Sequence, residues 1–492
     1  MASASSSRRY IGTKESVLYG IANGGQCLGY SFLTSYITYF FVNVFHVNPR
    51  YVALMLGLEG IWDTINDPLM GAVVDKTRTR YGKLRPYLLG VPIPLGITTI
   101  LLFAGPLIVT NPSPNAASKV IYMTATYLIW EFFYTIGDVP FWGLSTAVSP
   151  NPDDRTRAIT SARFISGIIG GLPGIAMPIL IDMSNSASGF NLKNVFGGMG
   201  LLAGTIGMGL FALSGIFVKE RVVHSEEEPS LRDCVNQIVK NPPLRLIILK
   251  EFLMAFSGIG GIYSNYYFID VLGSASSVIL TGILSTVVGF AAFMVVPLFK
   301  QRFNNRQLVI LSPVFQSVVN GFTYLAGMRN YSNMKVMIPL LMLNNALPAI
   351  FNGVNGVVPT EMIGETVDYM EWTTGQRNEG VSFSVLTFVG KLSGAISRSV
   401  ASYTLSLPWL GYKTSPDNAI VPQTATTKSR IWFMYMASPV LLRFIGVIPM
   451  FFYDLVGDKR QRMLDELAVR RADLMHEVST GGADAEASET AL

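Results

Sequence analysis

Long apolar segments dominate this sequence and limit what it can fold into. A helix needs roughly 20 mostly apolar residues to cross the hydrocarbon core of a bilayer. Twelve segments of the 492-residue chain meet that requirement, at about 17–43, 51–74, 86–109, 119–147, 158–183, 196–218, 244–270, 277–299, 307–328, 335–358, 380–405 and 429–455. Charged residues make up 14% of the chain, against about 25% in soluble proteins. We therefore expect an all-α polytopic membrane protein with twelve transmembrane helices.

Basic residues gather in alternate connections between these segments. The connections after the second, sixth and eighth segments are rich in Lys and Arg, whereas the odd-numbered connections hold few. The positive-inside rule then places both termini in the cytoplasm, and this orientation accounts for the net charge of +5 without a nucleic-acid partner. Two cysteines, Cys27 and Cys234, suggest no disulfide framework. We expect a monomeric, multi-pass protein of the cell (inner or plasma) membrane, with the lipid bilayer as its surroundings.

A long polar connection divides six apolar segments from six. The basic connections 2–3 and 8–9 occupy matching places in the two halves, and this weak internal symmetry is similar to that of major facilitator transporters. The predicted units are an N-terminal six-helix bundle with a cytoplasmic tail (1–218), a cytoplasmic linker (219–243), a C-terminal six-helix bundle (244–456) and a cytoplasmic tail (457–492). In that tail, Met463, Leu464, Leu467 and Leu474 have the spacing of a short amphipathic helix, and we expect disorder beyond it.

Carboxylates lie inside the second apolar segment. Asp63 and Asp67 are four residues apart on one helix face, with Asn66 beside them. An ionisable residue at the bilayer centre costs ~2.5–3.5 kcal/mol on insertion scales, so it indicates function. Two carboxylates, an amide oxygen and a hydroxyl from elsewhere would form an all-oxygen site for a small hard cation. The alternative is that these groups only join helices through hydrogen bonds.

A second polar cluster lies in the fourth segment. Thr135, Asp138 and Trp142 share one helix face. A carboxylate accepts hydrogen bonds from sugar hydroxyls, and an indole covers the apolar face of a sugar ring. Two cations, Arg163 and Lys391, could balance these carboxylates, although Arg163 could instead extend to the cytoplasmic surface.

Several long motifs resemble one family of transporters. "WDTINDPLMG" followed by "TRYGKLRP", then "YTIGDVPFW", and "DYMEW" leading to "SVLTFVGK" are similar to the glycoside–pentoside–hexuronide:cation symporters of the major facilitator superfamily. The resemblance covers nearly all twelve segments. It implies three groups of residues: a cation site of Asp63, Asn66, Asp67 and Thr135; a sugar site of Asp138, Trp142, Arg163 and Lys391; and cytoplasmic gating by Arg85, Glu365, Asp368 and Glu371.

One position departs from the family pattern. The family's acidic residue in the first helix, a sugar ligand, falls here at Cys27. Asn23 and Gln26 lie nearby, and we expect them to bind sugar hydroxyls instead. Glu59 extends the acidic stripe one turn before Asp63. It is either solvated near the outer boundary, or it replaces the missing acidic group and reaches the sugar.

The expected function is uptake of a sugar (a glycoside, pentoside or hexuronide) coupled to a cation by alternating access. Na⁺ is the expected coupling ion, Li⁺ and H⁺ stay open, and no other cofactor is expected. One alternative is a cation-coupled transporter of a non-sugar substrate such as a lysolipid, and another is a membrane enzyme or a non-transporting sensor. The polar cluster on the fourth segment favours sugar over lipid. No histidine lies inside an apolar segment and no phosphate-binding loop is present, so we expect no enzyme activity.

Overall fold

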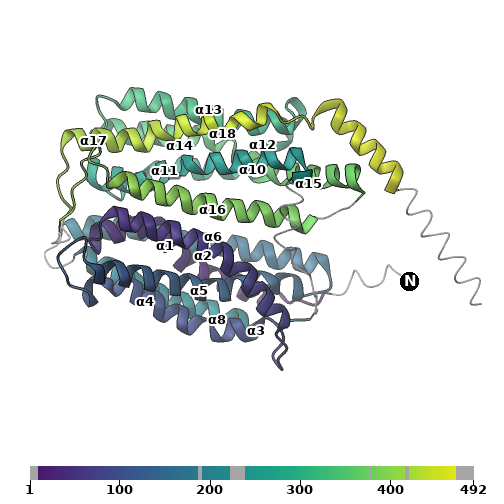
Figure 1. The fold of residues 1–492 in the computed structure, drawn as a ribbon, viewed down its shortest axis with the longest axis horizontal. Coiled ribbons are helices and arrows are strands. Elements are labelled where there is room, and N and C mark those ends of the chain that lie inside the picture. The colour runs from purple at the N-terminus through teal and green to yellow at the C-terminus, as the bar shows by residue number, and fades with distance from the viewer. Residues whose placement is uncertain (1–8, 187–190, 222–238, 376–378, 416–419, 472–492) are drawn as a thin grey trace, which may run out of the picture.

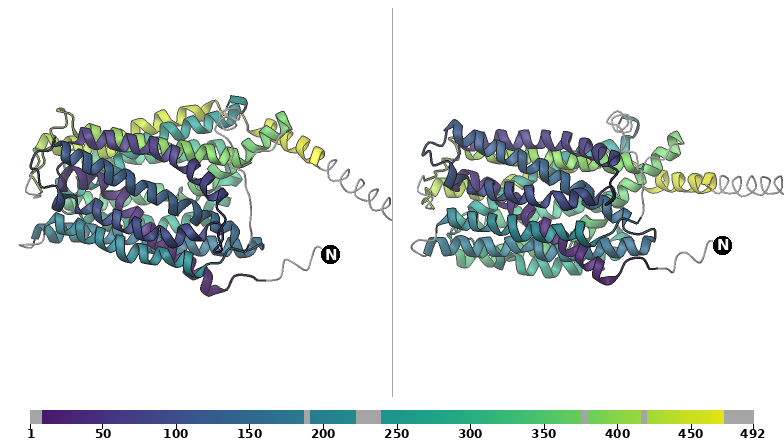
Figure 2. Two further views of the ribbon diagram at one scale, coloured as in Figure 1. Left: turned by 60° about the horizontal axis from the view of Figure 1, so that its bottom comes forward. Right: turned by 90° about the horizontal axis from the view of Figure 1, so that it is seen from below.

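The computed structural model describes residues 9–186, 191–221, 239–375, 379–415 and 420–471. Within these ranges the chain is helical apart from its turns and loops, and the described residues contain only an isolated β-bridge between Thr79 and Gly82. Figure 1 shows the helices running side by side along the long axis of the molecule, and Figure 2 shows the same arrangement from two further sides. The predicted all-α class is confirmed.

The helices follow the predicted apolar segments closely. Those of the first half are α1 (Thr13–Tyr39) continued by the π-helical η1 (Phe40–Val44), α2 (Pro49–Lys76), α3 (Arg85–Gly90), α4 (Pro92–Ile108), α5 (Ala117–Ala147), α6 (Pro152–Ser186), α7 (Leu192–Leu202), η2 (Ala203–Gly207) and α8 (Met208–Phe217). Those of the second half are α10 (Pro242–Ala255), η3 (Phe256–Gly258), α11 (Ile259–Tyr266), η4 (Tyr267–Val271), α12 (Ser277–Arg302), α13 (Asn305–Gly327), α14 (Met334–Ala349), α15 (Asn352–Thr374), α16 (Glu379–Leu405), α17 (Ala425–Trp432), η5 (Phe433–Ala437) and α18 (Ser438–Phe451).

Length and composition make seven of the described helical runs suitable for crossing a membrane. They are Asp153–Ser184, Leu192–Phe217, Pro242–Val271, Ser277–Arg302, Asn305–Gly327, Met334–Thr374 and Ala425–Phe451. The number of twelve crossings stays a prediction. Helix α2 shows why a hydropathy window misses some segments: Leu54 and Ile61 are exposed on one face, whereas Glu59 and Asp63 are buried on the other. Apolar side chains outside and acidic side chains inside suit a helix that faces lipid on one side only.

Two layers make up the molecule. Helices α1–α8 lie together below helices α10–α18 in the view of Figure 1, and α2 packs along α16 where the layers meet. Gly60 of α2 lies directly against Ala395 of α16, where a larger side chain would clash. Small residues at such a crossing let two helix backbones approach closely, and this approach brings side chains of α16 within reach of the acidic face of α2.

The C-terminal amphipathic helix is partly described. Residues 457–471 are helical, with Met463 and Leu467 buried and Leu464 packed beside them. Leu474 and the predicted disordered end lie outside the described residues, as do residues 222–238 of the predicted linker. The domain boundaries themselves stay predictions.

Candidate functional site

Lys391 of α16 joins the two acidic residues predicted to bind a cation. Its Nζ atom lies 3.3 Å from each carboxylate oxygen of Asp63 and forms a closer ion pair with Asp67. Asp63 is only 8% exposed, whereas Asp67 is half-buried. The helical spacing thus directs both carboxylates to the same side of α2. In this conformation the Lys391 ammonium group lies between them.

The remaining predicted cation ligands, Asn66 and Thr135, are both buried. Asn66 lies on the same helix as the two aspartates, and its Nδ2 atom has no hydrogen-bond partner among the described residues. Thr135 is buried on α5, which packs against α2. Among the described residues, no group of three or more His, Cys, Asp or Glu side chains is arranged to hold a metal ion. A cation could be held here by Asp63 and Asp67 together with neutral oxygens, once Lys391 moves away.

Glu59 forms a second ion pair between the two halves. It is 5% exposed and accepts hydrogen bonds from Arg398 of α16 at 3.0 Å to each carboxylate oxygen. In this conformation Glu59 is therefore buried and paired instead of solvated. Sequence reasoning missed Arg398, although a cationic residue inside an apolar segment was a signal that could have identified it.

Glu131 is another buried carboxylate that the motifs did not single out. It lies on α5 one turn before Thr135 and is 5% exposed. It interacts electrostatically with Glu59 and Asp63 as well as with the two cations of α16. The acidic cluster is therefore larger than the two aspartates that the sequence motif emphasised.

The predicted sugar-site residues of α5 gather around Asp138. Gln26 of α1 donates a hydrogen bond to Asp138 at 2.7 Å, and the Trp142 indole donates another. The Arg163 guanidinium lies 4.4 Å from the centre of the Trp142 ring, within the range of a cation–π contact. Lys391 also interacts with Asp138 electrostatically. The structure thus brings Gln26, Asp138, Trp142 and Arg163 together.

Cys27, the position that departs from the family pattern, lies near the same cluster around Asp138. The Cys27 thiol interacts electrostatically with Asp138 and Arg163 and lies 3.7 Å from the Asn23 amide oxygen. The Asn23 NH₂ group donates to the Ala162 carbonyl at 3.4 Å. Gly170 lies against Cys27, so α1 and α6 approach closely at this level. Asn23 therefore helps to join α1 to α6, whereas Gln26 is the amide that reaches Asp138.

Contacts between the two halves close one end of the molecule. Asn265 donates to the Ser35 carbonyl at 2.7 Å, and the Tyr412 hydroxyl lies 2.8 Å from the Asn43 amide oxygen. Asp182 accepts backbone hydrogen bonds from Ala275 and Ser276, at the start of α12. Together with the α2–α16 ion pairs, these contacts join the halves from this end to the acidic cluster.

The predicted gating residues form contacts within their own halves. Arg85 donates to the Gly215 carbonyl at 3.0 Å, so it joins α3 to the end of α8. Glu365 accepts from Arg460 at 2.8 Å, while Arg471 binds Asp368 at 2.7 Å and Glu371 at 2.5 Å. The three acidic residues thus anchor the C-terminal helix of residues 457–471 to α15.

Two charged groups of that C-terminal helix are perturbed by these contacts. Hydrogen bonds from Arg462 and Trp372 hold the pKa of Glu466 below its usual range. Hydrogen bonds to Glu371 and Asp368 raise the pKa of Arg471. In each case the bonds favour the charged form, so the helix is attached to α15 in part by ionic contacts.

Comparisons with known proteins agree with this architecture. A protein-family model described as "MFS/sugar transport protein" matches residues 18–457. The chain is 25% identical to the inner membrane symporter YicJ of Escherichia coli K12, over 93% of this chain and 95% of the relative. It is 26% identical to the glucuronide carrier protein homolog of the same organism (91% and 93% covered) and 23% identical to the isoprimeverose transporter of Lactiplantibacillus pentosus (92% and 91% covered).

Solved structures share the fold at low sequence identity. A bacterial homolog of the human lysosomal transporter Spinster, in an inward-facing conformation, matches with a TM-score of 0.63 and 14% identity, covering 90% of this chain and 96% of that one. A D-xylose–proton symporter matches with a TM-score of 0.59 and 13% identity, covering 88% and 96%. Because the family model spans most of its length, this chain belongs to the MFS/sugar transport protein family of multi-pass membrane transporters.

Proposed function

We propose that this chain is a secondary active symporter that carries a sugar or glycoside together with a cation by alternating access. The observation that carries the proposal is the placement of Lys391 between Asp63 and Asp67, beside the Gln26–Asp138–Trp142 cluster. Relatives described as symporters, a glucuronide carrier homolog and an isoprimeverose transporter support a sugar as the substrate class.

Lys391 links the cation site to the sugar site. When Na⁺ binds Asp63 and Asp67, it replaces Lys391 as the cation that neutralises these two carboxylates. The released ammonium group then turns toward Asp138, with which it already interacts, and the sugar binds in a polar site of reduced charge. Because each ligand favours the same arrangement of Lys391, each raises the affinity for the other by the same factor.

Na⁺ is the proposed coupling ion because the available ligands are all oxygen atoms, which hard cations prefer. Li⁺ has the same preference, and a proton could bind one of the carboxylates directly. The Arg163 guanidinium above Trp142 also suits a sugar that bears a carboxylate. A hexuronide is therefore included among the proposed substrates.

The described conformation is closed on the outer side. The basic connections after α2, α8 and α12 place those helix ends in the cytoplasm by the positive-inside rule, so the end joined by Asn265, Tyr412 and Asp182 faces outward. Opening to the outside requires α16 to separate from α2. That separation breaks both the Lys391 and the Arg398 ion pairs.

Counterflow in proteoliposomes tests the proposed function. Vesicles that contain the purified chain are loaded with an unlabelled glycoside, pentoside or uronide, and entry of the labelled sugar is followed with and without Na⁺. We expect at least one sugar to exchange, faster with Na⁺ than with a large organic cation. Exchange of none of the panel under any cation condition would overturn the assignment to sugar symport.

A further inference from the structure

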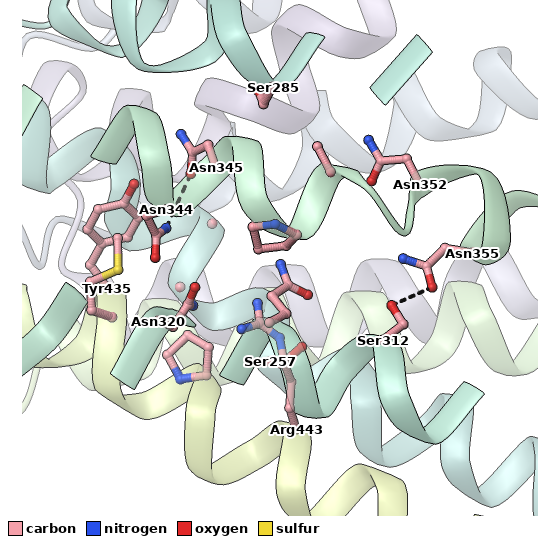
Figure 3. Close-up of a pocket in the computed structure, with 17 residues that line it drawn as sticks. Ser257, Ser285, Ser312, Asn320, Asn344, Asn345, Asn352, Asn355, Tyr435 and Arg443 are labelled. Atoms are coloured by element: carbon pink, nitrogen blue, oxygen red, sulfur yellow. Dashed lines mark hydrogen bonds between the residues drawn. The ribbon is translucent and has the colours of Figure 1, made fainter. Parts of the chain in front are cut away.

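A polar cavity of about 350 Å³ lies inside the second half of the molecule, apart from the α2–α16 cluster (Figure 3). Its wall carries an unusual concentration of side-chain amides, namely Gln316, Asn320, Asn344, Asn345, Asn352 and Asn355. Among the seventeen described residues that line it, Arg443 of α18 is the one with a formal charge, and none is acidic. The described wall therefore carries a net positive charge.

Three irregular stretches of helix meet at this cavity. Ser257 belongs to the 3₁₀ segment η3 between α10 and α11, and Tyr435 belongs to the π-helical η5 before α18. Asn352 begins α15, after a turn at residues 350–351 that interrupts the path from α14. Irregular backbone inside a membrane is tolerated where it lines a cavity, and interrupted helices often mark ligand sites.

The start of α15 adds positive potential to the same wall. Phe351 precedes the helix and provides no side-chain cap, and the first N–H groups of any α-helix lack partners within the helix. The aligned peptide dipoles of α15 place a partial positive charge there. Asn352, its first residue, lines the cavity that Arg443 enters from the opposite side in Figure 3. Both sources of positive potential thus act on the same cavity.

A hydrogen bond in the wall fixes the orientation of the Asn355 amide. Ser312 donates to the Asn355 amide oxygen at 2.8 Å, so this oxygen is turned toward α13. Figure 3 shows the NH₂ group of Asn355 directed away from Ser312, toward the cavity. A guanidinium and amide NH₂ groups are hydrogen-bond donors that suit a negatively charged ligand.

We propose that this cavity, between Arg443 and Asn352, is a binding site for a small monovalent anion, either a halide or a short carboxylate. A monovalent anion matches the one formal charge that the described lining residues carry. The bound anion joins α18 to the irregular junction of α14 and α15, and it thereby stabilises the second half of the protein. The site is separate from the proposed sugar and cation sites. The test of anion binding therefore does not depend on the proposed transport function.

Thermal unfolding of the purified full-length chain in detergent measures the proposed binding. Chloride, bromide or acetate is titrated as its sodium salt against sodium HEPES, so that the Na⁺ concentration stays constant. We expect a saturable rise in the unfolding midpoint, because a ligand that binds only the folded state stabilises it. A response to halides alone identifies an inorganic anion, and a response to acetate alone identifies a carboxylate. No saturable response to any of the three would overturn the proposal.

Substitutions then locate the site. Arg443→Gln removes the charge, and we expect roughly tenfold or weaker anion binding, the size of a lost charged hydrogen bond. Arg329→Gln removes an exposed arginine after α13 and serves as the matched control with unchanged binding.

Asn352→Asp separates binding from folding. An acidic residue in the first turn of α15 favours the helix but repels an anion, so the variant should fold and lose the anion response. If the unfolding midpoint of Asn352→Asp responded to the anions as the wild type does, the proposal would be overturned, even if Arg443→Gln failed to fold. Bromide-soaked crystals provide a direct test, since an anomalous peak is expected beside Arg443.

Discussion

Removing the charge of Glu59 should open the outer side of this transporter. In the closed arrangement Glu59→Gln leaves the Arg398 guanidinium facing a neutral amide, although both groups are largely shielded from water. Removing one partner of a buried ion pair costs about 3–5 kcal/mol of stability. Because a quarter of the Arg398 side chain is exposed, we reduce this to about 2 kcal/mol. In the open arrangement water hydrates Arg398, so the cost falls on the closed state alone and shifts the equilibrium roughly 30-fold.

Spin-label distances report this shift. Labels at Asn111 and Arg329, exposed in loops of opposite halves at the closed end, should show a longer distance component in Glu59→Gln than in the parent. The double variant Glu59→Gln/Arg398→Gln removes both charges and should return toward the parent distribution, because no buried charge is left unpaired. Unchanged distances in Glu59→Gln, or a double variant more open than either single one, would refute the reasoning.

Three further predictions concern separate parts of the molecule. Asp63→Asn and Asp67→Asn should each abolish Na⁺-stimulated uptake while sugar binding persists, and unaltered Na⁺ dependence in both would remove the cation from α2. Asp138→Asn should weaken sugar binding about tenfold or more in calorimetry, since it removes a charged acceptor; an unchanged titration would contradict this placement of the sugar site. The partners of Glu466 lower its pKa. Its charged side chain therefore contributes fully to the attachment of residues 457–471 above the ordinary carboxyl pKa, near pH 4. This contribution is lost as the pH falls further, through the lowered pKa. Hydrogen exchange of this helix, corrected for intrinsic rates, should be faster at pH 3 than at pH 6 and faster in Glu466→Gln at pH 6; equal protection in all three conditions would exclude the ionic contribution.

Local pattern was sufficient to predict much of this fold. Long apolar runs predict the helices because a bilayer requires about 20 residues per crossing. The i and i+4 spacing of Asp63 and Asp67 predicts their shared direction, and the structure places both at Lys391. The same spacing rule predicts that Asp138 and Trp142 lie together, as the indole hydrogen bond shows.

Pairing across the two halves could not be predicted from local pattern. Glu59 and Arg398 are separated by 339 residues, and nothing in either segment specifies the other as a partner. Lys391 was expected beside Asp138, whereas its closest contacts in this conformation are with α2. Helix spacing gives the direction of a side chain, but the packing of α2 against α16 decides which opposite charge it meets.

Sodium entry driven by sugar tests the central claim most directly. Proteoliposomes with equal Na⁺ inside and outside receive an inward gradient of a sugar identified by counterflow, and radioactive Na⁺ is followed over time. If both ligands share one transport cycle through Lys391, the sugar gradient should drive net Na⁺ accumulation, and Lys391→Gln should abolish it. Entry of the sugar without any net Na⁺ movement would contradict sodium-coupled symport by this protein.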